Sequence, residues 1–238
     1  MVAHRAIVHP DPGMQRIDRH VSPEDVSKLD DRARLFRLVQ VIQARDLLTF
    51  EHSRRVAHYA RSLSRALGHN RDVAQQYWQL GMIHDVGKMW IGEAILNKAG
   101  SLTATEFEKV REHAQAGARL ITGFDLPEFY APAVHHHHEM FDGSGYPAGL
   151  AGTTIPEAAR LLAIVDAFDV ITSERPYKLA ATLDVAMNEI MRGAGTQFDP
   201  DMVQIFVCLT ANNSHFIIPA RLCAVKTNTA RYQIVTGF

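Results

Sequence analysis

The chain has 238 residues, of which 47% are hydrophobic and 21% charged, a balance typical of an ordinary globular protein that buries its own core. Its 25 Lys and Arg residues against 26 Asp and Glu residues give a net charge of −1, which excludes a global basic field that would attract DNA. No apolar run approaches the length of about 20 residues that a transmembrane helix needs. The 13 histidines are many beside 6 tyrosines, and this excess indicates a chemical role.

The first 21 residues are expected to form an arm or linker. They place Pro10, Pro12 and Gly13 among charged residues and lack the apolar run of a signal peptide. Ser22-Pro23-Glu24-Asp25 then predicts a helix start, with a capping hydroxyl, proline at the first helical position and acids near the positive end of the helix dipole. Because residues 1–21 are too few for a receiver or sensory domain, we expect regulation to come from outside this chain or from a further part of the protein.

Helical spacing of hydrophobic residues runs through most of the remaining chain. Thr103, followed by Glu106 three residues later, predicts a capping box at one helix start. After a first helix that contains Leu35, Leu38, Val39 and Ile42, we expect helices near 51–67, 71–84, 103–122, 127–138, 156–173, 182–192 and 200–209. The fold class is therefore predicted to be all-α, a bundle of about seven to nine helices over residues 22–210, with long irregular connections at 89–102 and 140–155.

The last segment, residues 211–238, has a different pattern. Residues 221–225 and 231–235 resemble two short strands around Thr227-Asn228-Thr229, which predicts a small C-terminal β-hairpin. Cys208 and Cys223 fit no metal-binding spacing, so we expect reduced thiols in a cytoplasmic protein, with a disulfide as the alternative.

Two adjacent pairs of metal-binding residue types lie far apart in the sequence. His84 and Asp85 are neighbours at a predicted helix end, so their side chains leave about 100° apart and one residue can bind a metal while the carboxylate reaches a second. His137 and His138 repeat this arrangement on another predicted helix. Imidazole and carboxylate together suit iron, manganese or zinc.

Asp166 and Asp169 lie three apart on an otherwise apolar helix, where an acid is costly unless it is paired or binds metal. Each of these signals has a structural alternative. A single His-Asp dipeptide is weak, the run from His135 to His138 could be a solvated turn, and Asp166 could pair with Arg160 or Arg175. The conjunction of all of them along one helical chain favours a two-metal site, the kind that cleaves phosphate esters with water.

This conjunction resembles the HD-GYP family, the cyclic di-GMP phosphodiesterase branch of the HD-domain metal hydrolases, over roughly residues 33–210. The resemblance is carried by Asp46–Val56, Ile83–Lys88, Ile95–Lys98, His113 with Gly117, His137-His138-Glu139, Asp142–Pro147, Val165–Asp169, Arg175–Lys178 and Gly195–Pro200. Departures are Met140 after His-His-Glu, and Gly92 and Ala99 in the loop after Lys88; they concern loop shape more than chemistry.

The resemblance implies a dinuclear site, whose first metal is bound by His52, His84, Asp85 and Asp166. It implies that Asp85 bridges to a second metal, which His113, His137 and His138 also bind, and that a hydroxide between the metals attacks the phosphate. Some relatives bind a third metal through a glutamate four residues before the first histidine. Leu48 occupies that position here, so we expect two divalent ions, iron or manganese.

Substrate contacts are expected from three cations and one acid. Lys88 is interpreted as a phosphate ligand that also serves catalysis, with a surface lysine as the alternative. The resemblance implies that Arg175 and Lys178 bind the phosphate or guanine of the dinucleotide, although cations at a helix C-terminus are also favourable without any ligand. Asp169 either has a catalytic role, orienting the nucleophile or bonding Lys88, or steadies a ligand histidine.

The leading hypothesis is a phosphodiesterase that hydrolyses cyclic di-GMP to pGpG, with a second step to GMP as an open alternative. The alternatives are a cyclic di-GMP sensor or partner-docking module that keeps the fold, and a phosphohydrolase for another cyclic dinucleotide. A diguanylate cyclase or another signalling protein is the expected protein partner, and the helix with Leu35 and Ile42 could serve a homodimer.

Overall fold

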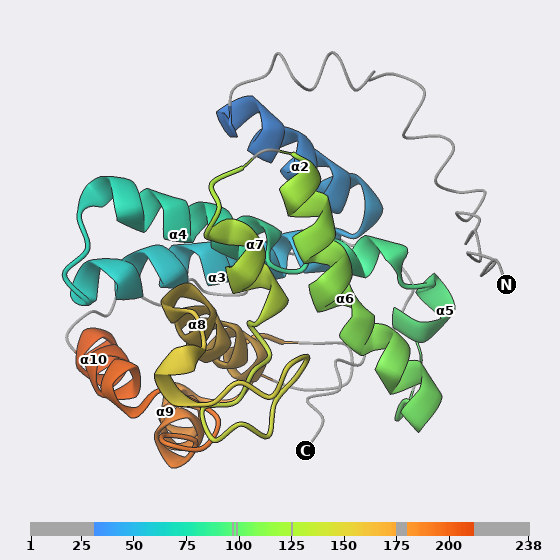
Figure 1. Ribbon diagram of the computed structural model, residues 1–238. Coiled ribbons are helices and arrows are strands. Elements are labelled where there is room, and N and C mark those ends of the chain that lie inside the picture. Colours follow the sequence, from blue (N-terminus) through green and yellow to red (C-terminus); the bar gives the residue numbers. More distant parts are fainter. Residues whose placement is uncertain (1–30, 97, 99, 125, 175–179, 212–238) are drawn as a thin grey trace, which may run out of the picture.

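The computed structural model describes residues 31–96, 98, 100–124, 126–174 and 180–211 (Figure 1). Across these residues the chain is helical and contains no β-strand, only an isolated bridge between Ala194 and Phe198, so the all-α prediction is confirmed. The predicted arm, the helix start at Ser22 and the C-terminal hairpin lie outside the described residues.

The helices follow the predicted order with shifted ends. The α-helices are α2 (Asp31–Arg45), α3 (Leu47–Ala66), α4 (Arg71–Ile83), α5 (Glu93–Leu96), α6 (Ala104–Gly123), α7 (Tyr130–His135), α8 (Glu157–Thr172), α9 (Leu183–Arg192) and α10 (Pro200–Ala211). Two short 3-10 helices, η3 (Val86–Trp90) and η4 (Gly152–Thr154), lie in the predicted long connections. Of the described helices, none is long and apolar enough to cross a membrane.

Helices α3 and α4 form a close pair that lies side by side across the molecule (Figure 1). Asp46 caps α3 by accepting a hydrogen bond from the Leu48 amide at 2.9 Å, and Asn70 caps α4 through the Val73 amide at 2.9 Å. A Cβ atom at Gly81 would lie only 2.4 Å from the Cα of Ala57. The absence of a side chain at Gly81 therefore lets the two helix backbones touch.

The core lies between this pair and helices α8 and α10. Phe168 of α8 contacts the ring of Tyr59 from α3 at 5.2 Å between centroids and the ring of Phe206 from α10 at 5.1 Å, both edge to face. All three rings are fully buried. Burying each such side chain contributes about 1.5–3 kcal/mol, so these contacts hold α8 firmly against α3.

Helix α2 turns its apolar face inward. Leu35, Leu38 and Ile42 are buried in the same core as the α3–α4 pair. The face that suggested a homodimer is therefore already covered within the chain, whereas Phe36 on the same helix is 59% exposed. Dimerisation itself stays a prediction.

Helix α6 begins at the predicted capping box and lies across the end of α4. The Thr103 hydroxyl accepts a hydrogen bond from the Glu106 amide, and the Glu106 carboxylate accepts one from the Thr103 amide, which confirms that prediction. A Cβ atom at Gly87 in η3 would lie 1.9 Å from the carbonyl oxygen of His113 and 2.6 Å from the amide nitrogen of Gly117. The backbone of η3 thus rests directly on the backbone of α6.

Candidate metal centre

The seven predicted metal ligands come together in one place from separate elements. His52 lies on α3, His84 and Asp85 join α4 to η3, His113 lies on α6, and Asp166 lies on α8. His137 and His138 follow the end of α7. The short contacts described below link these side chains, which are buried except for the partly buried His138 and Asp166: His52, His84, Asp85, His113, His137, His138 and Asp166.

The first group of ligands consists of His52, His84 and Asp85, with Asp166 beside them. The Nε2 atom of His52 lies 3.1 Å from Asp166 Oδ1 and 3.7 Å from Asp85 Oδ2. The Nε2 atom of His84 lies 3.4 Å from Asp85 Oδ2 and 4.0 Å from Asp166 Oδ1. Two ring nitrogens and two carboxylates therefore face one another across a small space.

The Nε2 atoms of His52 and His84 are fully buried and have no hydrogen-bond partner. The Nδ1 atom of His84 lies 2.9 Å from the carbonyl oxygen of Gly81, so the ring donates from Nδ1 and leaves a lone pair on Nε2. An unpaired lone pair in a buried space is costly, and it is rare unless something binds there. A cation satisfies the unpaired nitrogens and the carboxylates together.

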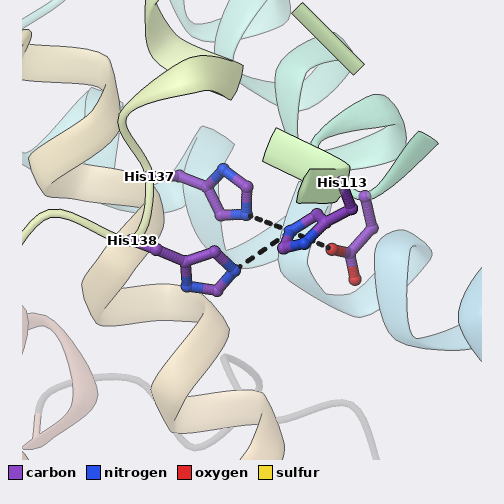
Figure 2. Close-up of side chains that lie close together, drawn as sticks. His113, His137 and His138 are labelled. Atoms are coloured by element: carbon purple, nitrogen blue, oxygen red, sulfur yellow. Dashed lines mark hydrogen bonds and ion pairs between the residues drawn. The ribbon is translucent and has the colours of Figure 1, made fainter. Parts of the chain in front are cut away.

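The second group of ligands consists of His113, His137, His138 and Asp85. Figure 2 shows His137 and His138 pointing from the stretch after α7 toward His113 on α6. The Nε2 atom of His113 lies 3.4 Å from Nε2 of His137, 3.1 Å from Nε2 of His138 and 3.5 Å from Asp85 Oδ1. Asp85 thus presents one oxygen to each group.

The ring orientations of this second group also favour a cation. His113 and His137 each hold Nδ1 at 2.6 Å from a backbone carbonyl, that of Val110 and of Val134 respectively. Donation from Nδ1 leaves lone pairs on both Nε2 atoms, and these lone pairs face each other without a proton between them. A metal ion between them removes this repulsion, and the bond from Nδ1 to a carbonyl is the usual way of orienting a metal-binding histidine.

Burial and charge keep the four ligands of the second group in their metal-binding protonation states. Burial lowers the pKa of His113 to about 4 and that of His137 to about 3, and it holds the pKa of His138 well below its ordinary value. Burial alone would raise the pKa of Asp85, but the charges of Lys88, His84, His113 and His52 hold it well below the usual range. Neutral imidazoles and an ionised carboxylate are the forms that bind metal.

Burial alone would lower the pKa of His52. Its close contacts with Asp166 and Asp169, together with their negative charges, raise it instead. The first group therefore attracts a positive charge even without metal. The donor set of nitrogen and oxygen atoms, with no cysteine among the described ligands, fits iron, manganese or zinc and not a structural zinc site built on thiolates.

Lys88 lies beside the centre, although not one helical turn after His84 as an unbroken helix would place it. Helix α4 ends at Ile83, and Lys88 lies in η3. Its Nζ atom is 2.5 Å from Asp85 Oδ2, and its side chain is 18% exposed. The ammonium group therefore lies at the edge of the centre, where it contacts the carboxylate that faces both groups.

Asp169 lies behind His52, on the side away from the other ligands. Its Oδ2 atom is 2.7 Å from Nδ1 of His52, and Arg55 contacts both of its carboxylate oxygens. Of the two roles considered for Asp169, this position favours steadying a ligand histidine over orienting the nucleophile or bonding Lys88.

The alternative role considered for Asp166, an ion pair with Arg160, is not formed. Arg160 instead donates hydrogen bonds to Asp199 and to the carbonyl oxygen of Ile155. Arg175 and Lys178, the other predicted substrate ligands, lie outside the described residues.

The loop between α7 and α8 is anchored by Glu139, a role that sequence reasoning missed. Its buried carboxylate accepts hydrogen bonds from the amides of Ala148, Gly149 and Leu150 at 2.8–3.2 Å. This anchoring holds Tyr146 with its ring stacked on His138 at 4.9 Å between centroids, while Arg111 of α6 lies 4.5 Å over the Tyr146 ring. The sequence offered one signal for this role: an acid lies just before a glycine-rich loop, whose backbone amides need acceptors.

Comparison with known proteins finds a matching family model and several similar proteins. The family model described as HD domain matches residues 38–202. The chain is 36% identical over 175 residues to the cyclic di-GMP phosphodiesterase response regulator RpfG of Xanthomonas campestris, covering 73% of this chain and 46% of that protein. It is 34% identical over 155 residues to 3'3'-cGAMP-specific phosphodiesterase 1 of Vibrio cholerae, covering 65% of this chain and 36% of that protein.

Among solved structures, an HDGYP protein from Bdellovibrio bacteriovorus, Bd1817, matches 83% of this chain and 67% of its own with a TM-score of 0.59 and 14% sequence identity. At that identity the likeness concerns the fold. The chain spans less than half the length of the two phosphodiesterases named above.

Proposed function

This chain belongs to the HD domain family, as the resemblance to its HD-GYP branch predicted, and we propose that it is a metal-dependent phosphodiesterase which hydrolyses cyclic di-GMP to pGpG. The observation that carries the proposal is Asp85, whose two oxygens face two separate groups of buried histidines. Relatives named as cyclic di-GMP phosphodiesterases, at 33–38% identity, support the reaction and the substrate.

We propose two metal ions, iron or manganese. His52, His84, Asp85 and Asp166 would hold one, and Asp85 with His113, His137 and His138 would hold the other. When bound, such a pair of ions acts as a Lewis acid toward the phosphate and lowers the pKa of a metal-bound water molecule to about 7. Leu48 is half exposed and offers no ligand atom at the position where some relatives bind a third metal, which favours two ions.

The chain's own residues would position the reacting groups. Lys88 would donate a hydrogen bond to a phosphate oxygen, because its Nζ atom already lies at the rim of the centre beside Asp85. Asp169 would hold the ring of His52 so that Nε2 points into the first ligand group, toward Asp166 and Asp85. Arg175 and Lys178 would bind the phosphate that is not being cleaved; this assignment rests on the sequence motif.

A second candidate substrate is 3'3'-cGAMP, another cyclic dinucleotide. It is favoured by the similarity to the cGAMP-specific phosphodiesterase of Vibrio cholerae, which is nearly as high as that to the cyclic di-GMP enzymes. A role as a sensor without turnover is disfavoured, since all seven predicted ligands are present and converge.

The setting of the activity is proposed from the sequence. We place the protein in the cytoplasm, because two cysteines in 238 residues fit no disulfide framework. A diguanylate cyclase or another signalling protein remains the proposed partner. A homodimer would have to use a surface other than the buried face of α2, such as that around Phe36.

The test combines metal analysis of anaerobically purified protein with turnover of cyclic di-GMP and 3'3'-cGAMP. Two metal ions per chain and hydrolysis of cyclic di-GMP are expected; His84→Ala should lose the ion of the first position and abolish hydrolysis. His58→Ala is the matched control, since it removes an imidazole from α3 outside the two ligand groups. Wild-type turnover in His84→Ala would reject the site, and bound metal without turnover of either dinucleotide would favour the sensor.

A further inference from the structure

His52 is oriented differently from the other histidines of the centre. The rings of His84, His113 and His137 each place Nδ1 against a carbonyl oxygen three residues earlier in the chain. Their orientation therefore follows from the local backbone. The Nδ1 atom of His52 instead contacts a side chain, the carboxylate of Asp169 on a different helix, at 2.7 Å.

A side chain can rotate away unless something fixes it, and Arg55 fixes Asp169. The Nε atom of Arg55 donates to Oδ1 at 2.6 Å, and its Nη2 atom donates to Oδ2 at 3.0 Å. This two-point contact sets the plane of the carboxylate, which a single hydrogen bond would not do. Asp169 has no exposed side-chain surface, and the side chain of Arg55 is 11% exposed.

The position of Arg55 on its helix makes this contact local to the centre. Arg55 lies three residues after His52 on α3, so the two side chains leave the same face of the helix and meet the same carboxylate of α8. The result is a chain of contacts from Arg55 through Asp169 to His52, whose other nitrogen is the unpaired Nε2 of the first group.

We propose that Arg55 is a positioning residue, which fixes Asp169 and through it the ring of His52, so that the first of the two metal positions binds tightly. This inference rests on the proposed function only in that it needs the two metal positions. Its consequence is selective: loss of the Arg55 fork weakens the position made by His52, His84, Asp85 and Asp166. The position made by His113, His137 and His138 keeps its affinity because backbone carbonyls hold the rings of His113 and His137 and, among the described residues, no contact of this group depends on Arg55.

The experiment is a calorimetric titration of metal-stripped full-length chain with Mn²⁺. The variants are Arg55→Gln, which keeps a polar group but loses the charge and the fork, and Arg55→Lys, which keeps the charge but offers a single ammonium. Arg54→Gln is the matched control, because Arg54 is the adjacent arginine and forms an ion pair with Glu51 on the same helix. We expect Arg55→Gln to lose about 10- to 100-fold in affinity at one position, the range typical of residues that orient a ligand. Arg55→Lys should regain part of this loss, and Arg54→Gln should match wild type.

The affected position is identified by repeating Arg55→Gln in two backgrounds. In His113→Ala, which keeps the first position, Arg55→Gln should weaken the remaining site by the same factor as in wild type. In His52→Ala, which keeps the second, it should have no further effect. Circular dichroism and thermal unfolding report whether each variant is folded; if Arg55→Gln is unfolded, Arg55→Lys takes its place in both backgrounds, with an expected loss of about 10-fold.

The outcomes separate this inference from the function it extends. Wild-type protein that binds no Mn²⁺ overturns the metal centre itself. Two wild-type affinities in the folded Arg55 variant, an equal loss at both positions, or a further loss in the His52→Ala background would each overturn the role of Arg55 while leaving the centre in place.

Discussion

The two halves of the candidate metal centre are built by different means. The half around His52, His84 and Asp166 contains carboxylates and is supported from behind by the buried pair of Arg55 and Asp169. The half around His113, His137 and His138 contains mainly neutral rings, which pack edge to face or tilted against each other. Backbone carbonyls hold two of these rings, those of His113 and His137. The first half thus depends on a long-range side-chain contact at Nδ1 of His52, whereas Nδ1 of His113 and of His137 contacts local backbone, and the two halves should respond differently to substitution and to pH.

Substitution of Asp85 should have the largest effect, because it is the residue that the two halves share. Asp85→Asn keeps the shape of the side chain but removes the charge that faces both groups. Metal should be lost from both positions, and turnover should fall by more than about 100-fold, the upper limit for residues that merely orient a ligand. Metal analysis and the cyclic di-GMP assay measure this directly. If Asp85→Asn retains two ions, the two halves do not depend on a shared carboxylate.

Single histidine substitutions should divide the centre into its halves. His52→Ala should retain one metal ion at the second position, and His113→Ala should retain one at the first, because each removes a ligand of one group only. Turnover should fall about 100-fold or more in both, since hydrolysis requires the pair. Elemental analysis of the two purified variants is the measurement. Loss of both ions from either variant would mean that the halves assemble as a single unit.

The pH dependence of stability should have opposite signs in the two halves of the metal-free protein. Burial lowers the pKa of His113 to about 4 and of His137 to about 3, so the unfolded chain binds more protons than the folded chain below about pH 6.5. Stability should therefore fall as the pH drops from 6.5 toward 4, by about 1.4 kcal/mol per pH unit for each histidine at most.

The raised pKa of His52 acts in the other direction. Burial opposes this shift, but Asp166 and Asp169 favour the protonated ring, so its contribution is fully present below pH 6.5 and is lost as the pH rises through the folded-state pKa. Urea unfolding of chelator-treated protein should thus show a stability maximum near neutral pH. His52→Asn should remove the decline on the alkaline side only, and a decline that persists there would assign it to another group.

Substitution of Glu139 should have the smallest effect on the centre and a measurable effect on its surroundings. In the native protein the two carboxylate oxygens of Glu139 accept hydrogen bonds from three loop amides, and Glu139→Gln leaves only one acceptor oxygen for them. The expected cost is about 1.5–3 kcal/mol of unfolding free energy, measured by urea denaturation, because hydrogen bonds to a charged group are lost. Metal content should not change, since both ligand groups keep their own supports. Loss of the ion at the second position would show instead that the stacking of Tyr146 on His138 is needed for binding.

Sequence patterns predicted most of the helices because apolar periodicity and caps are local signals. Thr103 and Glu106 form the predicted box, and the stretches around α3, α4, α6 and α8 match within a few residues. The end of α7 was not predictable in this way. Helix α7 stops at His135 because the Val134 carbonyl accepts from the ring of His137, where a continuing helix would use the amide of His138.

The convergence of the ligands followed from motif resemblance, whereas their supports did not. Arg55 lies on a helix rich in arginines, and only the position of Asp169 on α8 reveals that this one is buried and Arg54 is not. Spacing alone offered a hint, since Arg55 follows His52 by three residues. Which acid it meets depends on how α8 packs on α3, and that is a tertiary property.

The contact of Gly87 with α6 sets the distance across the centre without any side chain. The backbone of Gly87 contacts the backbone of His113 and Gly117 directly, so no side-chain rotation there can make room for a larger residue, and the backbones that carry Asp85 and His113 are held at a fixed separation. Random mutagenesis should find many tolerated changes among the leucines of the core and almost none at this glycine. A laboratory effort to widen the centre for a larger cation would have to begin by shifting the whole of α6.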